Sequence, residues 1–332
     1  MSPNRNPTVA LLIGVAFALL PKSTVAEIPG QAVSPVEFKQ MRITDTWARY
    51  DGRLTWGRGQ VLAILDDGCD LKVPQWQVSF PWGKKVIASY DAIDGDDDPA
   101  HVPPGYHGTS VGFPSSLNYL GKLGVAFNNQ VAHVRAVTVV HLPTLESATI
   151  AAGLRWVIDN HRKYRITAVN LAALDDQRHK EPVPTGIDEP LREMKKLGIW
   201  VSAPCGNHHY TDGISWPACQ PDCFAIGATK PERDEVHLDR YRNTDILVPA
   251  KATSSSNAFI TGASMILREA IDTNQFDWHA EGPTLPDAMM AIFKKTGPEV
   301  FDRATGVTFR RLDLLAAVDY VFARSKRKAG GR

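Results

Sequence analysis

Short apolar segments alternate with segments of helical period along most of the chain. The apolar runs of strand length are Val61–Leu65, Val131–Val140, Ile166–Leu171, Ile199–Ala203 and Phe224–Thr229. Helical spacing is found in Leu145–Asn160, Pro190–Leu197, Ser256–Ile271, Pro286–Lys295 and Leu312–Val321, and near Phe38–Tyr50. Continuous apolar strands that alternate with helices are typical of a sheet buried on both faces. The pattern therefore predicts an α/β fold with a mostly parallel central sheet and helices on both faces.

The first 26 residues have the pattern of a secretory signal. Arg5 gives a positive start, residues 9–20 form an apolar run too short to span a bilayer, and small residues follow at Thr24-Val25-Ala26. We therefore expect a mature chain that begins near Glu27 and is secreted or periplasmic. An uncleaved membrane anchor is the alternative reading. No later stretch is long and apolar enough to predict a membrane span after signal cleavage.

Length and charge narrow the class of protein further. The chain has 332 residues, of which 43% are apolar, and its formal net charge is +1. This composition supports a substantial core, and it provides no basic field for nucleic acid, so we expect no nucleic-acid partner. We expect a signal peptide over residues 1–26, a short extension over 27–50, one α/β domain over 51–321 and a basic tail over 322–332.

The four cysteines leave their pairing open. Export would place Cys69, Cys205, Cys219 and Cys223 in a setting that permits disulfides. Cys219 and Cys223 are close in sequence and flanked by prolines, which favours a small disulfide loop, although four cysteines allow three pairings. A zinc site is the competing interpretation, and the chain shows no His/Cys quartet with metal-ligand spacing.

Three distant stretches each carry a residue type used in hydrolysis. Asp66 follows an apolar strand, His107 opens a predicted helix, and Ser254 precedes a long apolar helix. Asp…His…Ser is one of the known chain orders of a catalytic triad. Taken singly, these residues also fit a turn, a loop and a helix N-cap.

An ordered series of such stretches resembles the subtilisin-like serine proteases (subtilases, peptidase S8). The similar stretches are Asp66-Asp67-Gly68, His107–Val111, Gly124-Val125-Ala126, Val169–Ala173, Ala203–Asn207, Trp216-Pro217-Ala218, Thr253-Ser254 and Arg311-Leu312-Asp313. The resemblance runs from about Trp47 to Val321. It implies the three-layer sandwich of the subtilisin type and a peptidase domain over residues 51–321.

The resemblance also implies site residues and a substrate class. Asp66, His107 and Ser254 would be the triad of a serine endopeptidase acting on peptides or proteins, and Asn207 would donate to the oxyanion. Ala172, Ala173 and Leu174 would line the substrate cleft, with Pro204 and Cys205 near the floor of the primary pocket. No cofactor would be required. Asp175 and Asp176, just past the cleft strand, would favour basic substrate side chains or remain solvated loop charges.

Three of the similar stretches depart from the family pattern, one of them by Pro204, which replaces a small residue beside the primary pocket. Ala252 replaces the glycine before the Thr-Ser pair, and Gly112-Phe113-Pro114 follows the His107 stretch where a proline interrupts helical hydrogen bonding. These departures support a second hypothesis, a pseudo-protease that binds extended peptides without cutting them. A third hypothesis is a metal-dependent or aspartyl-nucleophile hydrolase built on Asp66 and Asp67.

Calcium is not supported at the usual family site. The position of one calcium-binding aspartate aligns with Gln75, and the loop at 117–121 is short. A separate acidic cluster of Asp94, Asp96 and Asp98 offers oxygen ligands for a weak calcium site. A solvated acidic turn explains the same cluster equally well.

Overall fold

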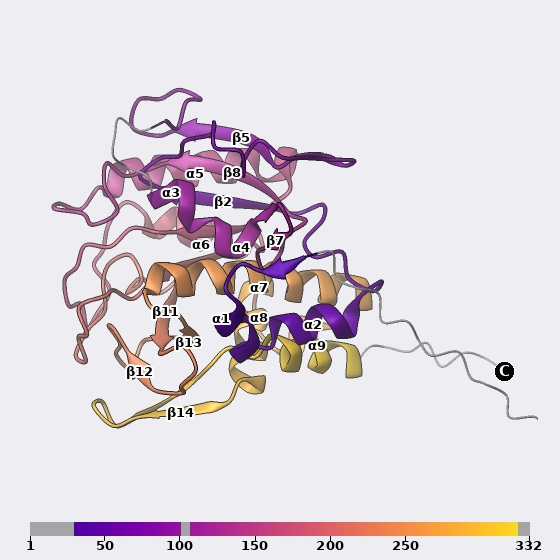
Figure 1. The fold of residues 1–332 in the computed structure, drawn as a ribbon. Coiled ribbons are helices and arrows are strands. Elements are labelled where there is room, and N and C mark those ends of the chain that lie inside the picture. Colours follow the sequence, from indigo (N-terminus) through magenta and orange to yellow (C-terminus); the bar gives the residue numbers. More distant parts are fainter. Residues whose placement is uncertain (1–29, 101–106, 325–332) are drawn as a thin grey trace, which may run out of the picture.

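An eight-stranded sheet forms the centre of the protein in the computed structural model, which describes residues 30–100 and 107–324 (Figure 1). Along the sheet the strands are β12 (Val236–His237), β11 (Phe224–Thr229), β10 (Trp200–Pro204), β9 (Ile166–Leu171), β2 (Val61–Asp66), β8 (Gln130–Arg135) and β5 (Val86–Asp91), with β13 (Ile246–Pro249) also paired to β11. Every pairing among them is parallel except that of β12 with β11. This arrangement confirms the predicted parallel α/β sheet.

Helices and small ribbons surround this sheet. The helices are α1 (Pro35–Gln40), α2 (Ile43–Tyr50), α3 (His107–Val111), α4 (Phe113–Ser116), α5 (Ser147–Tyr164), α6 (Asp188–Lys196), α7 (Thr253–Asn274), η1 (Trp278–Ala280), α8 (Leu285–Thr296) and α9 (Leu314–Ala323). The small ribbons pair β1 (Gln31–Ala32) with β7 (Lys122–Leu123), β7 with β6 (Asn118–Tyr119), β3 (Ser79–Phe80) with β4 (Gly83–Lys84), and β14 (Glu299–Asp302) with β15 (Val307–Arg310).

Alternation along β2 divides the interior into two cores. Val61, Ala63 and Leu65 face the core that α5 and α6 cover, whereas Leu62 and Ile64 face the core that contains α7. Successive side chains of a strand point to opposite faces, so both layers are filled by one continuous apolar run. In Figure 1, α7 crosses below the strands, and α2, α8 and α9 lie beyond it.

The N-terminal helices belong to the same core as α7. Phe38 of α1 packs edge-on against Phe259 of α7 with ring centroids 5.5 Å apart, and Trp47 of α2 donates from Nε1 to the carbonyl of Val125 at 3.2 Å. The single helix expected near Phe38–Tyr50 is two helices because Arg42 adopts a left-handed conformation with φ of 57°. Residues 35–50 thus pack as part of the domain.

Most predicted elements are present, and two differences are informative. Strands β9 and β11 have the predicted bounds, but β8 ends at Arg135 rather than Val140. The last bond of the ladder runs from the Ala136 N–H to the carbonyl of Asp66 at 2.9 Å, and the pairing stops there because β2 itself ends at Asp66. No apolar run predicts the edge strand β5, because its side chains are mostly half-buried.

A buried lysine joins the strand region to the loop before β8. The Lys85 side chain is 1% exposed, and its Nζ donates to the carbonyls of Phe127 and Asn129 and to Asn129 Oδ1 at 2.7–3.1 Å. Buried ammonium groups require such oxygen partners. Lys85 therefore cross-links two segments inside the protein.

Residues 1–29, which include the predicted signal, lie outside the described part of the chain, and so does most of the predicted basic tail. Within the described residues, no helix has the length and apolar character needed to cross a membrane.

Candidate active site

Asp66 is the last residue of β2, and its side chain lies on the α7 side of the sheet. It follows Leu62 and Ile64 in the alternation, and it is 1% exposed. Burial raises the pKa of Asp66 to about 6, because the charged form loses water, although the neighbouring His107 opposes part of that rise. The carboxyl end of a parallel strand is where such sheets place their chemistry.

His107 begins α3 and contacts this carboxylate directly. Its Nδ1 lies 2.7 Å from Oδ2 and 3.0 Å from Oδ1 of Asp66. With Nδ1–H donating to the carboxylate, the tautomer assigned from this network leaves Nε2 as a base. Burial alone would lower the pKa of His107, but the charge and hydrogen bond of Asp66 outweigh it and leave the pKa raised above 6.5.

Asp67 and Gly108 fix the approach of α3 to the strand end. Asp67 Oδ1 accepts the backbone N–H of Gly108 at 3.0 Å. A Cβ at position 108 would stand 2.1 Å from the carbonyl oxygen of Gly68 and 2.9 Å from Asp66 Cβ, so only glycine fits there. Sequence reasoning assigned no role to Asp67 in orienting α3, and the doubled aspartate was the available signal.

Asn207 connects the loop after β10 to the first turn of α7. Its Oδ1 accepts the backbone N–H of Thr253 at 2.9 Å and the Thr253 hydroxyl at 3.0 Å. The same hydroxyl accepts the N–H of Gly206 at 3.2 Å. Because Oδ1 takes these donors, the Nδ2 amide of Asn207 lies on the other side of the amide group, and it has no acceptor among residues 30–100 and 107–324.

Ser254 lies in the first turn of α7, next to Thr253, with a partly exposed side chain. Its backbone N–H has no acceptor among the described residues, as expected for the start of a helix. Helix α3, which carries His107, packs against α7. In the described part of the chain no hydrogen bond joins Ser254 Oγ to His107, and such bonds are often long in unliganded sites.

The five residues predicted to contact substrate are all buried. Ala172, Ala173 and Leu174 follow β9, while Pro204 and Cys205 follow one another at the end of β10. Ala172 donates its N–H to the carbonyl of Leu65 at 3.0 Å, which places this segment beside Asp66. The side chains of these residues therefore offer a ligand little surface.

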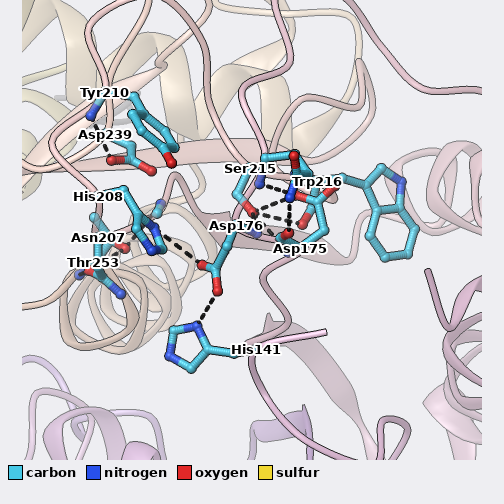
Figure 2. Close-up of polar contacts among 12 residues, drawn as sticks. His141, Asp175, Asp176, Asn207, His208, Tyr210, Ser215, Trp216, Asp239 and Thr253 are labelled. Atoms are coloured by element: carbon cyan, nitrogen blue, oxygen red, sulfur yellow. Dashed lines mark hydrogen bonds and ion pairs between the residues drawn. The ribbon is translucent and has the colours of Figure 1, made fainter. Parts of the chain in front are cut away.

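Asp175 has a structural role. It is neither of the two things expected from the sequence, a contact for basic substrate side chains or a solvated loop charge. Its side chain is buried, and it accepts hydrogen bonds from Ser215 Oγ at 2.8 Å and the Trp216 N–H at 2.9 Å (Figure 2). Its other oxygen lies 2.6 Å from His179 Nε2. This carboxylate is thus already satisfied by the protein. The next residue, Asp176, lies between two imidazoles, from His141 and His208.

The acidic cluster is largely occupied by its own chain. Asp94 pairs with Arg135 at 2.9 Å, and Asp96 and Asp98 each accept a backbone N–H two residues further on, at 2.9 Å and 3.0 Å. Over residues 30–100 and 107–324, no three His, Cys, Asp or Glu side chains are arranged to hold a metal ion.

The disulfide expected between Cys219 and Cys223 is not formed. All four cysteines are free and buried, and Cys219 Sγ contacts Gln220 Oε1 at 3.5 Å. Burial raises the pKa of the Cys219 thiol to about 12, so the group is an unreactive thiol at neutral pH.

Three comparisons with known proteins point to one family and one fold. A family model described as the subtilase family, Peptidase S8, matches residues 57–306. An intracellular serine protease of Paenibacillus polymyxa is 21% identical over 268 residues, covering 74% of this chain and 76% of that protein. The crystal structure of a cold-adapted subtilisin-like serine proteinase superposes with a TM-score of 0.57 at 18% identity, covering 77% of this chain and 89% of that one.

Proposed function

Because the chain belongs to the subtilase family, a family of serine peptidases, we propose that it is an exported serine endopeptidase whose triad is Asp66, His107 and Ser254. The observation that carries the proposal is the 2.7 Å contact between His107 Nδ1 and a buried Asp66 carboxylate, at the sheet edge where α7 begins. This contact holds the imidazole in the tautomer that a serine nucleophile requires.

The proposed reaction follows from the atoms at this edge. Ser254 Oγ attacks a peptide carbonyl carbon while His107 Nε2 takes the hydroxyl proton, and Asp66 stabilises the resulting imidazolium. Asn207 Nδ2 and the Ser254 N–H donate to the oxygen that becomes negative. His107 then returns the proton to the leaving amine, and water hydrolyses the acyl-enzyme by the same steps in reverse.

The test is active-site labelling with a fluorophosphonate, followed by mass spectrometry of the modified peptide. We expect label on Ser254 and cleavage of an unfolded protein such as reduced casein. Ser254→Ala should abolish both, whereas Ser255→Ala, one residue further along the same turn, should abolish neither. An unlabelled wild-type chain that leaves casein intact would overturn the proposal.

A second candidate function is a pseudo-protease that binds extended peptides without turnover. It is favoured by the lack of a hydrogen bond between Ser254 and His107 in the described residues, and by Ala252 in place of glycine before Thr253. Unlabelled protein that binds a peptide as tightly as its Ser254→Ala variant does would establish this function instead.

Export is the remaining part of the proposal, supported by the signal-like pattern of residues 1–26. Fractionation of cells that express the full chain, with N-terminal sequencing, tests it. A mature end near Glu27 outside the cytoplasm is expected, and an uncleaved cytoplasmic chain would refute it.

A further inference from the structure

The loop between β8 and α5 is closed by hydrogen bonds at its base. Residues 138–146 form this segment, called here the 138–146 loop. The Glu146 carboxylate accepts the backbone N–H of Thr138 at 2.7 Å and also the Thr138 hydroxyl. One side chain therefore joins the two ends of the loop.

The middle of the loop pairs with the segment that follows β9. Leu174 donates its N–H to the carbonyl of Val140 at 2.9 Å, and Leu142 donates its N–H to the carbonyl of Leu174 at 2.7 Å. His141 and Leu174 thus form a parallel bridge. The Leu142 side chain, 5% exposed, is buried in the core that α5 covers. Both backbone groups of Leu174 are consequently engaged by the loop.

A carboxylate beside this bridge links the loop to the segment that carries Asn207. Asp176 Oδ2 lies 2.7 Å from Nδ1 of His141, and Oδ1 lies 3.5 Å from Nδ1 of His208, an ion-pair contact too long to be a strong hydrogen bond. Figure 2 shows Asp176 between the two rings, with Asn207 and Thr253 nearby. Three segments of the chain therefore meet at this point.

This junction limits how far a substrate strand can extend along residues 172–174. Ala172 is bonded to Leu65, next to Asp66, so the segment leads away from the proposed triad. At a rise of roughly 3.3 Å per residue, Leu174 is about 7 Å further out than Ala172. A peptide that adds to this segment as a strand would need the N–H and C=O of Leu174 at that distance, and the loop already occupies both.

We infer that the 138–146 loop is a specificity element that occupies the strand position beside Leu174 and confines the bound peptide to Ala172 and Ala173. The substrate class is then peptides that end, or turn away from the strand, within two residues of the scissile bond on that side. His141 and Leu142 determine this limit by holding the loop in place. The inference rests on the proposed peptidase function.

The experiment measures kcat/KM on fluorogenic peptides lengthened from one to four residues, on each side of the scissile bond in turn. On one side of the scissile bond, kcat/KM of the wild type should rise less than about threefold when the peptide is lengthened from two residues to four. The loosened variant His141→Ala/Leu142→Ala should gain at least about tenfold over the same step, because the backbone of Leu174 becomes available. His141→Ala alone serves if the double variant does not fold. Val139→Ala is the matched control, since this side chain of the same loop is 43% exposed.

The outcomes separate the two proposals. Wild-type gains of more than about tenfold on both sides, or a loosened variant with an unchanged length profile, would overturn the inference. Fluorophosphonate labelling of Ser254 is measured on the same preparations. A chain labelled at Ser254 that fails the length test refutes only the loop's role, whereas an unlabelled, inactive chain refutes the proposed function.

Discussion

Replacing Asn207 tests the oxyanion site and the start of α7 separately. Asn207 has two roles in the structure: Oδ1 accepts two hydrogen bonds from Thr253, and Nδ2 faces away from them. Asn207→Ala removes both roles. Asn207→Asp keeps the acceptor and removes only the donor, so the two variants form a matched pair.

The expected magnitudes follow from these contacts. Asn207→Ala should lower the free energy of unfolding by about 1–2 kcal/mol, the cost of a lost helix cap and its hydrogen bonds. Asn207→Asp should leave stability unchanged or raise it by about 0.3–1 kcal/mol, because a negative charge at the N-terminus of α7 is favourable. Both variants should lower kcat by about 10²–10³-fold, a loss measured for an oxyanion donor within this same family.

The assay combines kcat on a short fluorogenic peptide at pH 8 with urea unfolding of the same preparations. Asn207→Asp is the informative variant, since it separates catalysis from folding. If it keeps kcat within about threefold of the wild type, Asn207 does not donate to the oxyanion. If Asn207→Ala unfolds at the same urea concentration as the wild type, the hydrogen bonds to Thr253 do not hold α7.

The remaining predictions concern the contact between Asp66 and α3. Gly108→Ala should lower kcat/KM by about 10²-fold and destabilise the protein by about 1–3 kcal/mol. The control is Gly186→Ala, because a Cβ added there meets nothing within 4 Å. This control should change neither kcat/KM nor the melting temperature. Asp67→Ala should lower the free energy of unfolding by about 1 kcal/mol, because the Gly108 N–H loses its acceptor. Asp67→Asn keeps an oxygen acceptor and should recover most of this stability. Equal losses in the two variants would show that the Asp67 side chain does not hold α3. The pH profile of kcat/KM should rise through a pKa above 6.5, the raised value of His107, and Asp66→Asn should move that midpoint to lower pH. Folding raises the pKa of Asp66 from 3.8 to about 6, so its contribution to stability is fully present below pH 3.8 and is lost as the pH rises through about 6. The free energy of unfolding of the wild type should therefore fall more steeply with pH across this window than that of Asp66→Asn. Equal slopes would contradict the assignment.

The sheet and its principal helices were predictable because each buried strand is a continuous apolar run. Ile166–Leu171 and Phe224–Thr229 were located to the residue for this reason. The edge strand β5 and the left-handed residue at Arg42 were not, since a half-buried edge carries no strong pattern and an arginine gives no sign of positive φ.

The sequence predicts only those residues of the site that belong to a recognisable motif. Order along the chain pointed to Asp66, His107 and Asn207, and the structure gives each of them a polar contact at the same edge of the sheet. The pairing of Leu174 with the 138–146 loop had no counterpart in the sequence, because it depends on backbone groups, which any residue carries. The burial of Asp175 was equally invisible, since its partners Ser215 and Trp216 lie about forty residues away in the chain.

Lys85 gives the fold an internal hydrogen-bond donor that is covalently part of the chain, and burial lowers the pKa of this amine well below its usual value. Three oxygens of Phe127 and Asn129 surround its side-chain nitrogen, and each is of a type that could otherwise bind a metal cation. A chelator cannot withdraw this group, and dilution cannot empty the site. The joint between the strand region and the loop before β8 therefore depends on hydrogen bonds within the chain and not on the concentration of a divalent ion.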